Sequence, residues 1–142
     1  MKQILFTIIC LIGYTSYAQS DRLKKADNYY NKLSYAYAAN LYEKLKGTEE
    51  DNTELKSKLA TSYLNINNYP KAIEYYAQIV ELPEATADDF YNYAYALKVN
   101  GNYTESDRWM QKFATAKPTD SRAKLFVANQ DYRAKIDNAK QY

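Results

Sequence analysis

The sequence predicts an all-α fold made of repeated helix–turn–helix units, and three observations carry this prediction. The stretch 59–80 contains two amphipathic segments that meet at Asn67 and Asn68, so it is expected to form two short helices. The same order of small and large apolar residues returns 34 residues earlier and 34 residues later. Gly and Pro number only three each among 142 residues, which favours helices over a strand-rich fold.

Three copies of the unit follow one another without an insertion, over 19–52, 53–86 and 87–120. Each copy places small residues where two helices would cross closely, and large apolar or aromatic residues beside them. In order, these residues are Ala26, Tyr29, Tyr35, Ala38, Tyr42 and Leu45, then Ala60, Tyr63, Tyr69, Ala72, Tyr76 and Ile79, then Ala94, Leu97, Tyr103, Ser106, Met110 and Phe113. One such copy would be weak evidence, but three in phase indicate an internal repeat.

A helix–turn–helix unit of 34 residues with this pattern resembles the tetratricopeptide repeat (TPR). The resemblance implies a right-handed superhelix of three repeats spanning the mature chain, 19–142. A last helix over about 121–140 keeps the phased small residue, Ala128, and becomes polar beyond it. We expect this helix to cap the array, because a terminal unit needs one apolar face and one wet face.

Residues 1–18 are predicted to be a cleaved signal peptide. An apolar run over 4–12 is too short to cross a bilayer, and small residues at Ser16 and Ala18 suit a signal peptidase. The alternatives are an uncleaved anchor or a lipoprotein acylated at Cys10, although Ile9 stands where lipoprotein processing needs a small residue. Cleavage would leave Gln19 first and remove the single Cys, so we expect a thiol-free periplasmic protein whose mature chain does not insert into a membrane.

Residues that carry catalytic chemistry are sparse in this sequence. There is no His, which is the commonest general base and metal ligand, and the mature chain has no Cys for thiolate chemistry or zinc. Carboxylate pairs such as Asp88 and Asp89 are adjacent, so on a helix they point apart. We therefore expect no enzyme activity, no metal and no cofactor. A net charge of +2 gives no electrostatic case for binding nucleic acid.

The TPR resemblance implies protein–protein interaction through a concave groove lined by the first helix of each repeat. The groove positions fall on Leu23, Asp27, Tyr30, Glu54, Ser57, Thr61, Leu64, Asp88, Tyr91, Tyr95, Lys98, Arg122, Leu125 and Asn129. Tyr91 and Tyr95 are the candidate anchors, because aromatic residues are favoured at binding hot spots. The alternative is that both tyrosines pack within the array.

Some TPR domains of co-chaperones hold a peptide C-terminal carboxylate with a basic, Asn-rich clamp. The clamp positions are occupied here by Leu23, Asp27, Lys58, Asp88 and Asn92. Because the basic pattern is essentially absent, that ligand is not transferred to this chain.

A second resemblance concerns the leader and the segments 21–27 and 123–129. A leader ending in Ala18 and Gln19, followed by a Tyr-rich array, looks like the N-terminal region of large Bacteroidota envelope proteins. In that family a β-propeller and a C-terminal OmpA-like, peptidoglycan-binding domain follow the TPR domain, and some members serve type IX secretion and gliding. The resemblance implies a longer protein, with peptidoglycan contacted only through a domain beyond 142.

Two functions remain open from the sequence. In the first, the domain is a periplasmic module that docks an outer-membrane or secretion-associated envelope protein, such as a barrel or its periplasmic tail. In the second, it is a structural spacer or a self-association domain with no peptide ligand.

Overall fold

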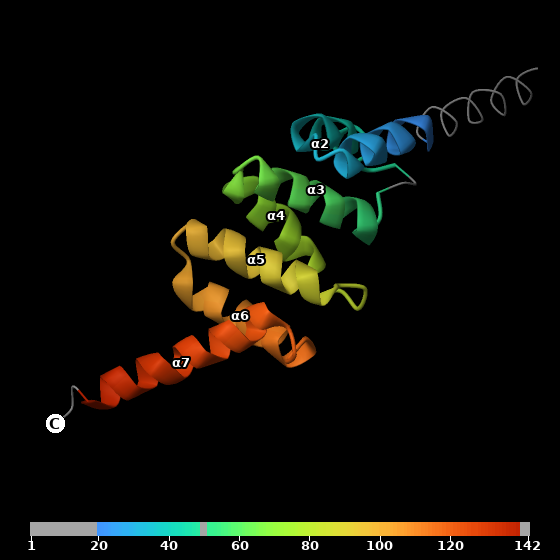
Figure 1. The fold of residues 1–142 in the computed structure, drawn as a ribbon. Coiled ribbons are helices and arrows are strands. Elements are labelled where there is room, and N and C mark those ends of the chain that lie inside the picture. The colour runs from blue at the N-terminus through green and yellow to red at the C-terminus, as the bar shows by residue number, and fades with distance from the viewer. Residues whose placement is uncertain (1–19, 49–50, 140–142) are drawn as a thin grey trace, which may run out of the picture. The chain divides into compact units, whose positions relative to one another are not determined.

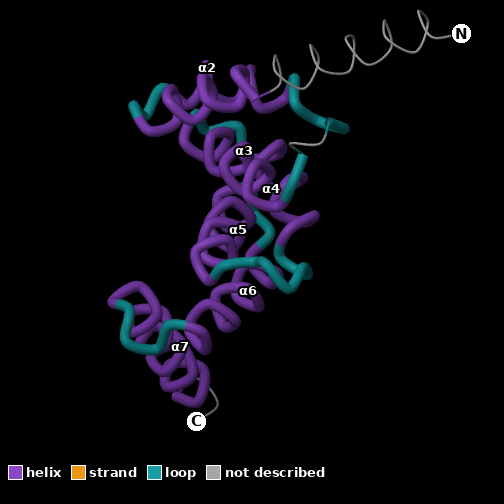
Figure 2. The backbone as a smooth tube through the Cα atoms, turned by 90° about the vertical axis from the view of Figure 1, so that its right-hand side faces the viewer, coloured by secondary structure: helices purple, strands orange, loops and turns teal. Residues whose placement is uncertain are grey.

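The computed structural model describes residues 20–48 and 51–139, and the predicted signal peptide at 1–18 lies outside them. Every regular element among the described residues is an α-helix, which confirms the predicted all-α class (Figures 1 and 2). The chain forms a helix over 20–31, then α2 (Tyr35–Glu43), α3 (Thr53–Asn65), α4 (Tyr69–Ile79), α5 (Ala87–Val99), α6 (Tyr103–Ala116) and α7 (Ser121–Ala139).

The helix starts follow from local sequence chemistry. The Asn52 side chain caps α3 by accepting a hydrogen bond from the Leu55 backbone N–H at 2.9 Å. Thr86 and Asp89 form a reciprocal capping box at the start of α5, with Asp in place of the usual Glu. Pro70 lies in the first turn of α4, where a missing N–H costs nothing.

The turn inside each repeat uses the same backbone conformation. Leu33, Asn67 and Gly101 have φ values of 59°, 59° and 87°, in the left-handed region. They stand at equivalent positions of the three copies. Glycine and asparagine accept this conformation readily, whereas a leucine pays a steric cost. The repeat is therefore visible in the backbone as well as in the sequence.

The described residues form two compact units that divide between Tyr75 and Tyr76. In the first unit, Ala26, Ala38 and Ala60 are fully buried, as the small positions of the repeat predict. Tyr42 is buried beside them, and its hydroxyl donates to Asp27 Oδ1 at 2.7 Å. Burial and this carboxylate raise the pKa of the Tyr42 hydroxyl well above its ordinary value.

In the second unit, α5 and α6 pack closely because their facing residues are small. The Ser106 hydroxyl donates to the Ala94 carbonyl at 2.7 Å, and both residues are buried. Phe113 of α6 and Ala123 of α7 belong to one apolar cluster, which fixes the start of α7 against α6. Ala128 differs from its counterparts, because it is exposed on α7 where Ala60 and Ala94 are buried. The rest of α7 projects beyond α5 and α6 (Figure 1).

Candidate interaction surfaces

The predicted groove residues fall into two sets, one in each compact unit. Those of the second unit lie on α5 and α7. Tyr91, Tyr95 and Lys98 are spaced along one face of α5, and Arg122, Leu125 and Asn129 along one face of α7. We call these six residues the α5–α7 surface.

Side chains of the two helices are in contact at one end of this surface and line a common pocket at the other. At one end, the Arg122 guanidinium lies 4.2 Å from the centroid of the Tyr91 ring. At the other end, Lys98 and Asn129 line one pocket of about 130 Å³, whose wall includes Phe126. Between the ends are Tyr95, which is 43% exposed, and Leu125, which is 63% exposed. The structure thus brings the predicted residues of the second unit together on one surface.

Tyr91 serves mainly as a packing residue within the unit. Its ring lies 5.2 Å from the ring of Phe113, and it packs against the apolar cluster around that residue. This agrees with the packing alternative for Tyr91, whereas the neighbouring Tyr95 is the more accessible of the two predicted anchors.

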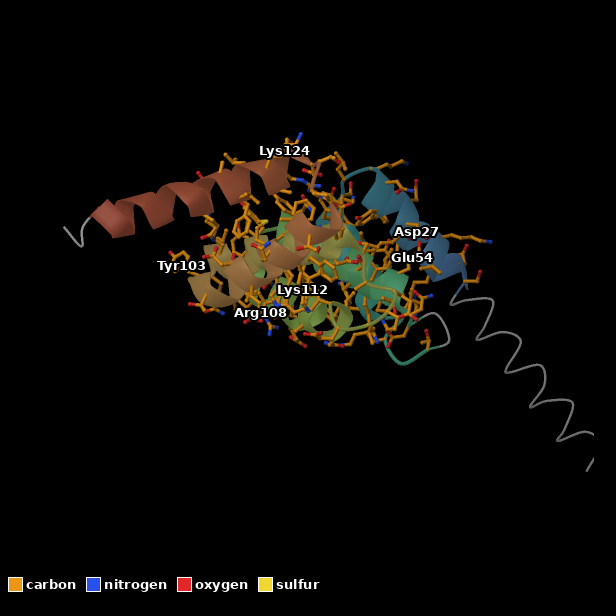
Figure 3. The ribbon with its side chains drawn as sticks, turned by 90° about the horizontal axis from the view of Figure 1, so that it is seen from below. Asp27, Glu54, Tyr103, Arg108, Lys112 and Lys124 are labelled. Carbon is orange, nitrogen blue, oxygen red and sulfur yellow. The ribbon has the colours of Figure 1, made fainter. Side chains whose placement is uncertain are left out.

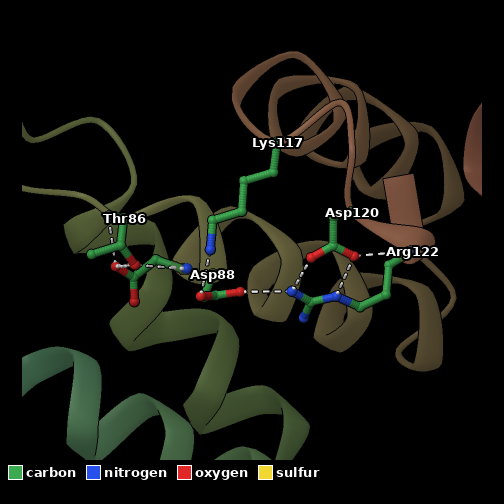
Figure 4. A network of polar contacts seen from close by, with 6 residues as sticks. Thr86, Asp88, Lys117, Asp120 and Arg122 are labelled. Carbon is green, nitrogen blue, oxygen red and sulfur yellow. Dashed lines mark hydrogen bonds and ion pairs between the residues drawn. The ribbon is translucent and has the colours of Figure 1, made fainter. Parts of the chain in front are cut away.

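Arg122 is held in a network of carboxylates (Figure 4). Its guanidinium donates to Asp88 Oδ1 at 2.9 Å and to both oxygens of Asp120, at 3.1 and 2.9 Å. Lys117 Nζ donates to Asp88 Oδ2 at 3.0 Å. Hydrogen bonds from Lys117 and Arg122 hold the pKa of Asp88 below its usual value, and those from Arg122 lower the pKa of Asp120 to about 2.

The sequence leads us to expect that Arg122 and Lys98 supply charge at one end of the groove, and this network corrects that expectation for Arg122. Its charge is balanced inside the unit by two carboxylates, so it holds α7 beside α5 as well as bordering the α5–α7 surface. Lys98 at the opposite end is exposed, and it is the cation of this surface that faces solvent.

The predicted groove residues of the first unit surround a second pocket, of about 170 Å³. Leu23, Asp27, Glu54 and Lys58 are among its lining residues, and Asp27 and Glu54 lie side by side in Figure 3. Lys58 Nζ contacts Asp27 Oδ1 at 3.0 Å and Glu54 Oε1 at 2.8 Å. Two carboxylates and one amine leave this pocket acidic, so it differs in charge from a carboxylate clamp.

The other predicted residues of the first unit are partly covered. Tyr30 packs edge-on against Tyr35, with ring centroids 5.5 Å apart. Ser57, Thr61 and Leu64 are half-buried along α3. This part of the predicted groove therefore presents less accessible apolar surface than the α5–α7 surface does.

A cluster around Glu43 was not anticipated from the sequence. Its Oε1 accepts hydrogen bonds from the Tyr63 hydroxyl at 2.6 Å, the Tyr75 hydroxyl at 2.9 Å and Lys71 Nζ at 3.3 Å. The Tyr63 and Tyr75 rings stack with centroids 5.8 Å apart. Burial disfavours the charge of Glu43, but these hydrogen bonds outweigh it and hold the pKa of the carboxyl below its ordinary value.

The same cluster shifts the tyrosine beside the carboxylate. Burial, with the hydrogen bond to Glu43, raises the pKa of Tyr63 to about 12. Glu43 therefore stays charged and Tyr63 stays neutral over the whole physiological pH range. The cluster is a fixed link between α2 and α3. The high number of tyrosines is the only sequence signal for this cluster, because Glu43 lies 20 residues from Tyr63 and 32 residues from Tyr75 along the chain.

Two further properties concern metal binding and membrane crossing by the described residues. Within 20–48 and 51–139, no group of three or more His, Cys, Asp and Glu side chains is arranged to hold a metal ion. Among the helices of the same residues, none is long and apolar enough to cross a membrane.

Comparison with solved structures identifies the fold. The second TPR domain of human RPAP3, solved in complex with the HSP70 peptide SGPTIEEVD, matches with a TM-score of 0.67 and 18% identity, over 80% of this chain and 95% of that one. The C-terminal TPR-containing domain of a putative FK506-binding protein from Plasmodium falciparum matches with a TM-score of 0.65 and 19% identity, over 82% and 91%. No protein-family model and no curated protein matches the sequence. At these identities the likeness establishes the fold alone, and the chain folds as a TPR domain.

Proposed function

We propose that the mature chain is a non-catalytic module that binds a segment of another envelope protein in the periplasm. The observation that carries the proposal is the α5–α7 surface, where exposed apolar side chains of Tyr95 and Leu125 lie between a fixed end at Arg122 and a polar pocket at Lys98. A structurally similar TPR domain was solved with a bound peptide, which supports this mode of binding.

The surface suggests what the ligand segment would carry. An apolar side chain of the ligand would cover Tyr95 and Leu125, because their exposed area is apolar and adjacent to packed residues. The pocket at Lys98 and Asn129 offers an ammonium and an amide beside the carboxylate of Asp107, so it suits a polar ligand group that both accepts and donates hydrogen bonds. The envelope partner, such as an outer-membrane barrel or its periplasmic tail, is part of the proposal.

Affinity capture from membrane extracts tests the proposal. The bait is residues 19–142, and the variant is Tyr95→Ala with Leu125→Ser. Tyr91 is left unchanged, because it packs against Phe113 and its loss would disturb the fold. Leu82→Ser is the matched control, since Leu82 is an exposed leucine outside the surface.

A single envelope protein that is retained by the wild type and by Leu82→Ser, but lost by the double variant, is the expected result. Equal capture by all three proteins would exclude the α5–α7 surface. Absence of any specific partner, with self-association in sedimentation experiments, would favour the spacer or self-association function.

The location is tested separately from binding. The exported protein should begin at Gln19 and carry no lipid, as intact mass or N-terminal sequencing would show. Acylation at Cys10 would contradict this and would place the domain on a lipid anchor.

A further inference from the structure

An exposed apolar patch lies at the turn of the first repeat and shares no residue with the α5–α7 surface. Leu33 is 70% exposed and Tyr37 is 68% exposed. The Tyr37 ring stacks on that of Tyr29, with centroids 5.4 Å apart and an angle of 25° between the planes. We call Tyr29, Leu33 and Tyr37 the turn patch.

The other repeats do not keep this patch apolar. The positions of Leu33 and Tyr37 are taken by Asn67 and Lys71 in the second repeat. They are taken by Gly101 and Glu105 in the third. Leu33 also adopts a left-handed φ of 59°, which is sterically unfavourable for leucine and easier for Asn or Gly. A leucine at this position is unfavourable for the backbone conformation and exposes apolar surface to water. A contact between its side chain and another molecule would account for its presence.

The second repeat shows what covers this face within the chain. There, Tyr63 and Lys71 occupy the positions of Tyr29 and Tyr37. Their hydroxyl and amine both bond Oε1 of Glu43, at 2.6 and 3.3 Å, and Glu43 belongs to the preceding helix, α2. Tyr63 is buried by this contact, whereas Tyr29 is only partly buried. The element that fits the face is thus a helix that presents a carboxylate to the tyrosine.

The rest of the face is different in the first repeat. Under α2, the second repeat buries Leu55, Leu59 and Ser62. The equivalent residues of the first repeat are Asp21, Lys25 and Asn28, all exposed. A helix is therefore not expected to lie along the whole face, and the contact would be confined to its turn end. Lys25 and Lys32 lie four residues before and three residues after Tyr29, on its side of the helix, whereas Asp21 lies further from the turn, so an acidic helix is favoured at the turn end.

We propose that the turn patch binds one end of an acidic amphipathic helix of a partner protein. An apolar side chain of that helix covers Leu33, and a carboxylate accepts from the hydroxyls of Tyr29 and Tyr37, as Glu43 does from Tyr63 and Lys71. The contact is small, so the interaction is weak and transient by itself. It is a second docking surface, separate from the one assigned in the proposed function.

Fluorescence anisotropy with labelled, hydrocarbon-stapled helices tests this proposal on residues 19–142. One probe is a Leu/Ala/Glu helix, and the other replaces every Glu by Lys. The variant is Leu33→Gly with Tyr37→Glu, which installs the residues of the third repeat and places a carboxylate against the acidic probe. Gly suits the left-handed turn, so the fold should be kept although the Tyr29–Tyr37 stacking is lost, and the melting temperature and helical circular dichroism of the variant check that lost binding is not unfolding.

We expect saturable binding of the acidic probe, at least tenfold weaker binding to the variant, and no comparable binding of the basic probe. Equal affinity for the wild type and the variant, equal affinity for both probes, or no binding of the acidic probe would each overturn the proposal. Tyr95→Ala with Leu125→Ser should bind the acidic probe normally, which separates this surface from the α5–α7 surface.

Two other occupants give different results with the same variant. A dimer in sedimentation velocity that the variant abolishes would assign the turn patch to a second copy of the chain. Binding to phosphatidylglycerol vesicles that the variant abolishes would assign it to an anionic membrane surface. Either result would overturn the assignment to a partner helix.

Discussion

Leu33 and Asn67 have the same backbone φ of 59°, at equivalent positions of successive repeats, although one side chain is apolar and the other is polar. The left-handed conformation is tolerated by asparagine, whose side chain can bond locally, and is sterically unfavourable for leucine. The turn geometry is therefore fixed by the helix packing of the repeat, and the residue at position 33 accommodates it at a cost.

This cost is measurable by exchanging the two residues. Leu33→Asn should raise the free energy of unfolding by about 1 kcal/mol, because it removes steric strain at an exposed site. Asn67→Leu should lower it by a similar amount. Urea denaturation of both variants measures these changes. If neither substitution changes the free energy of unfolding, the turn relaxes around either residue.

Much of the fold could be predicted from the sequence because the repeat determines it. The sequence predicts a helix cap at Asn52 or Thr53, a capping box opened by Thr86 and a tight turn at Asn100 and Gly101. The structure has the cap at Asn52, the box at Thr86 and a left-handed Gly101. Two helix ends were placed too late. The sequence pattern predicts a first helix over 21–33 and a second over 35–46, whereas the first ends at 31, before the turn at Leu33, and the second ends at Glu43, where turns begin. Tertiary packing decided these ends, since neither segment contains a strong breaker before them.

The candidate site was less predictable than the fold. Repeat phase predicts that Tyr95, Lys98 and Asn129 lie on neighbouring first helices, but it does not tell which charges of the surface are neutralised. Arg122 and Asp88 pair across one repeat period, and opposite charges at the same repeat position were the signal that could have found them. The Glu43 cluster joins residues at unrelated repeat positions, so phase gave no indication of it.

Overpacking tests the close contact between α5 and α6. Ala94 is fully buried, and its carbonyl accepts from the Ser106 hydroxyl, so there is no room for a larger side chain. Ala94→Leu should lower the free energy of unfolding by about 1–3 kcal/mol. Ala128→Leu is the control at the same repeat position, because Ala128 is exposed and should accept leucine without loss. Equal melting temperatures for the two variants would contradict the assigned register.

Glu43 should make stability depend on pH. Its folded pKa is depressed, so its stabilising effect is fully present above the unfolded carboxyl's pKa of about 4.3 and is lost as the pH falls through the folded pKa. Glu43→Gln should cost about 1–2 kcal/mol at pH 7, because three donors lose a charged acceptor. The gap between wild type and variant should narrow below about pH 4 in urea titrations. A gap that stays constant from pH 7 to pH 3 would show that the charge of Glu43 is not what stabilises the cluster.

Arg122 should be replaceable neither by a neutral residue nor by lysine. Its guanidinium bonds both oxygens of Asp120 while lying over Tyr91, and a lysine cannot combine planar bidentate bonding with stacking. Because the side chain is 38% exposed, solvent screening limits the expected loss for Arg122→Lys to about 1 kcal/mol. The loss should be local, since Arg122 joins α7 to α5 whereas the α5–α6 core does not need it.

Hydrogen exchange resolves where this loss falls. Amides at the start of α7, around Ala123, should exchange faster in Arg122→Lys, while those around Ala94 keep their protection. Lys124→Gln is the matched control, because Lys124 is an exposed cation on the same helix, outside the carboxylate network.

Acid should mimic the substitution in the wild type. The pKa of Asp120 is lowered to about 2, so its contribution holds above the unfolded pKa and disappears as the pH approaches 2. Equal exchange rates at the start of α7 in the wild type and in both variants would show that the carboxylate network does not hold α7. The α5–α7 surface would then be ordered by the apolar contacts of Ala123 and Phe126 alone.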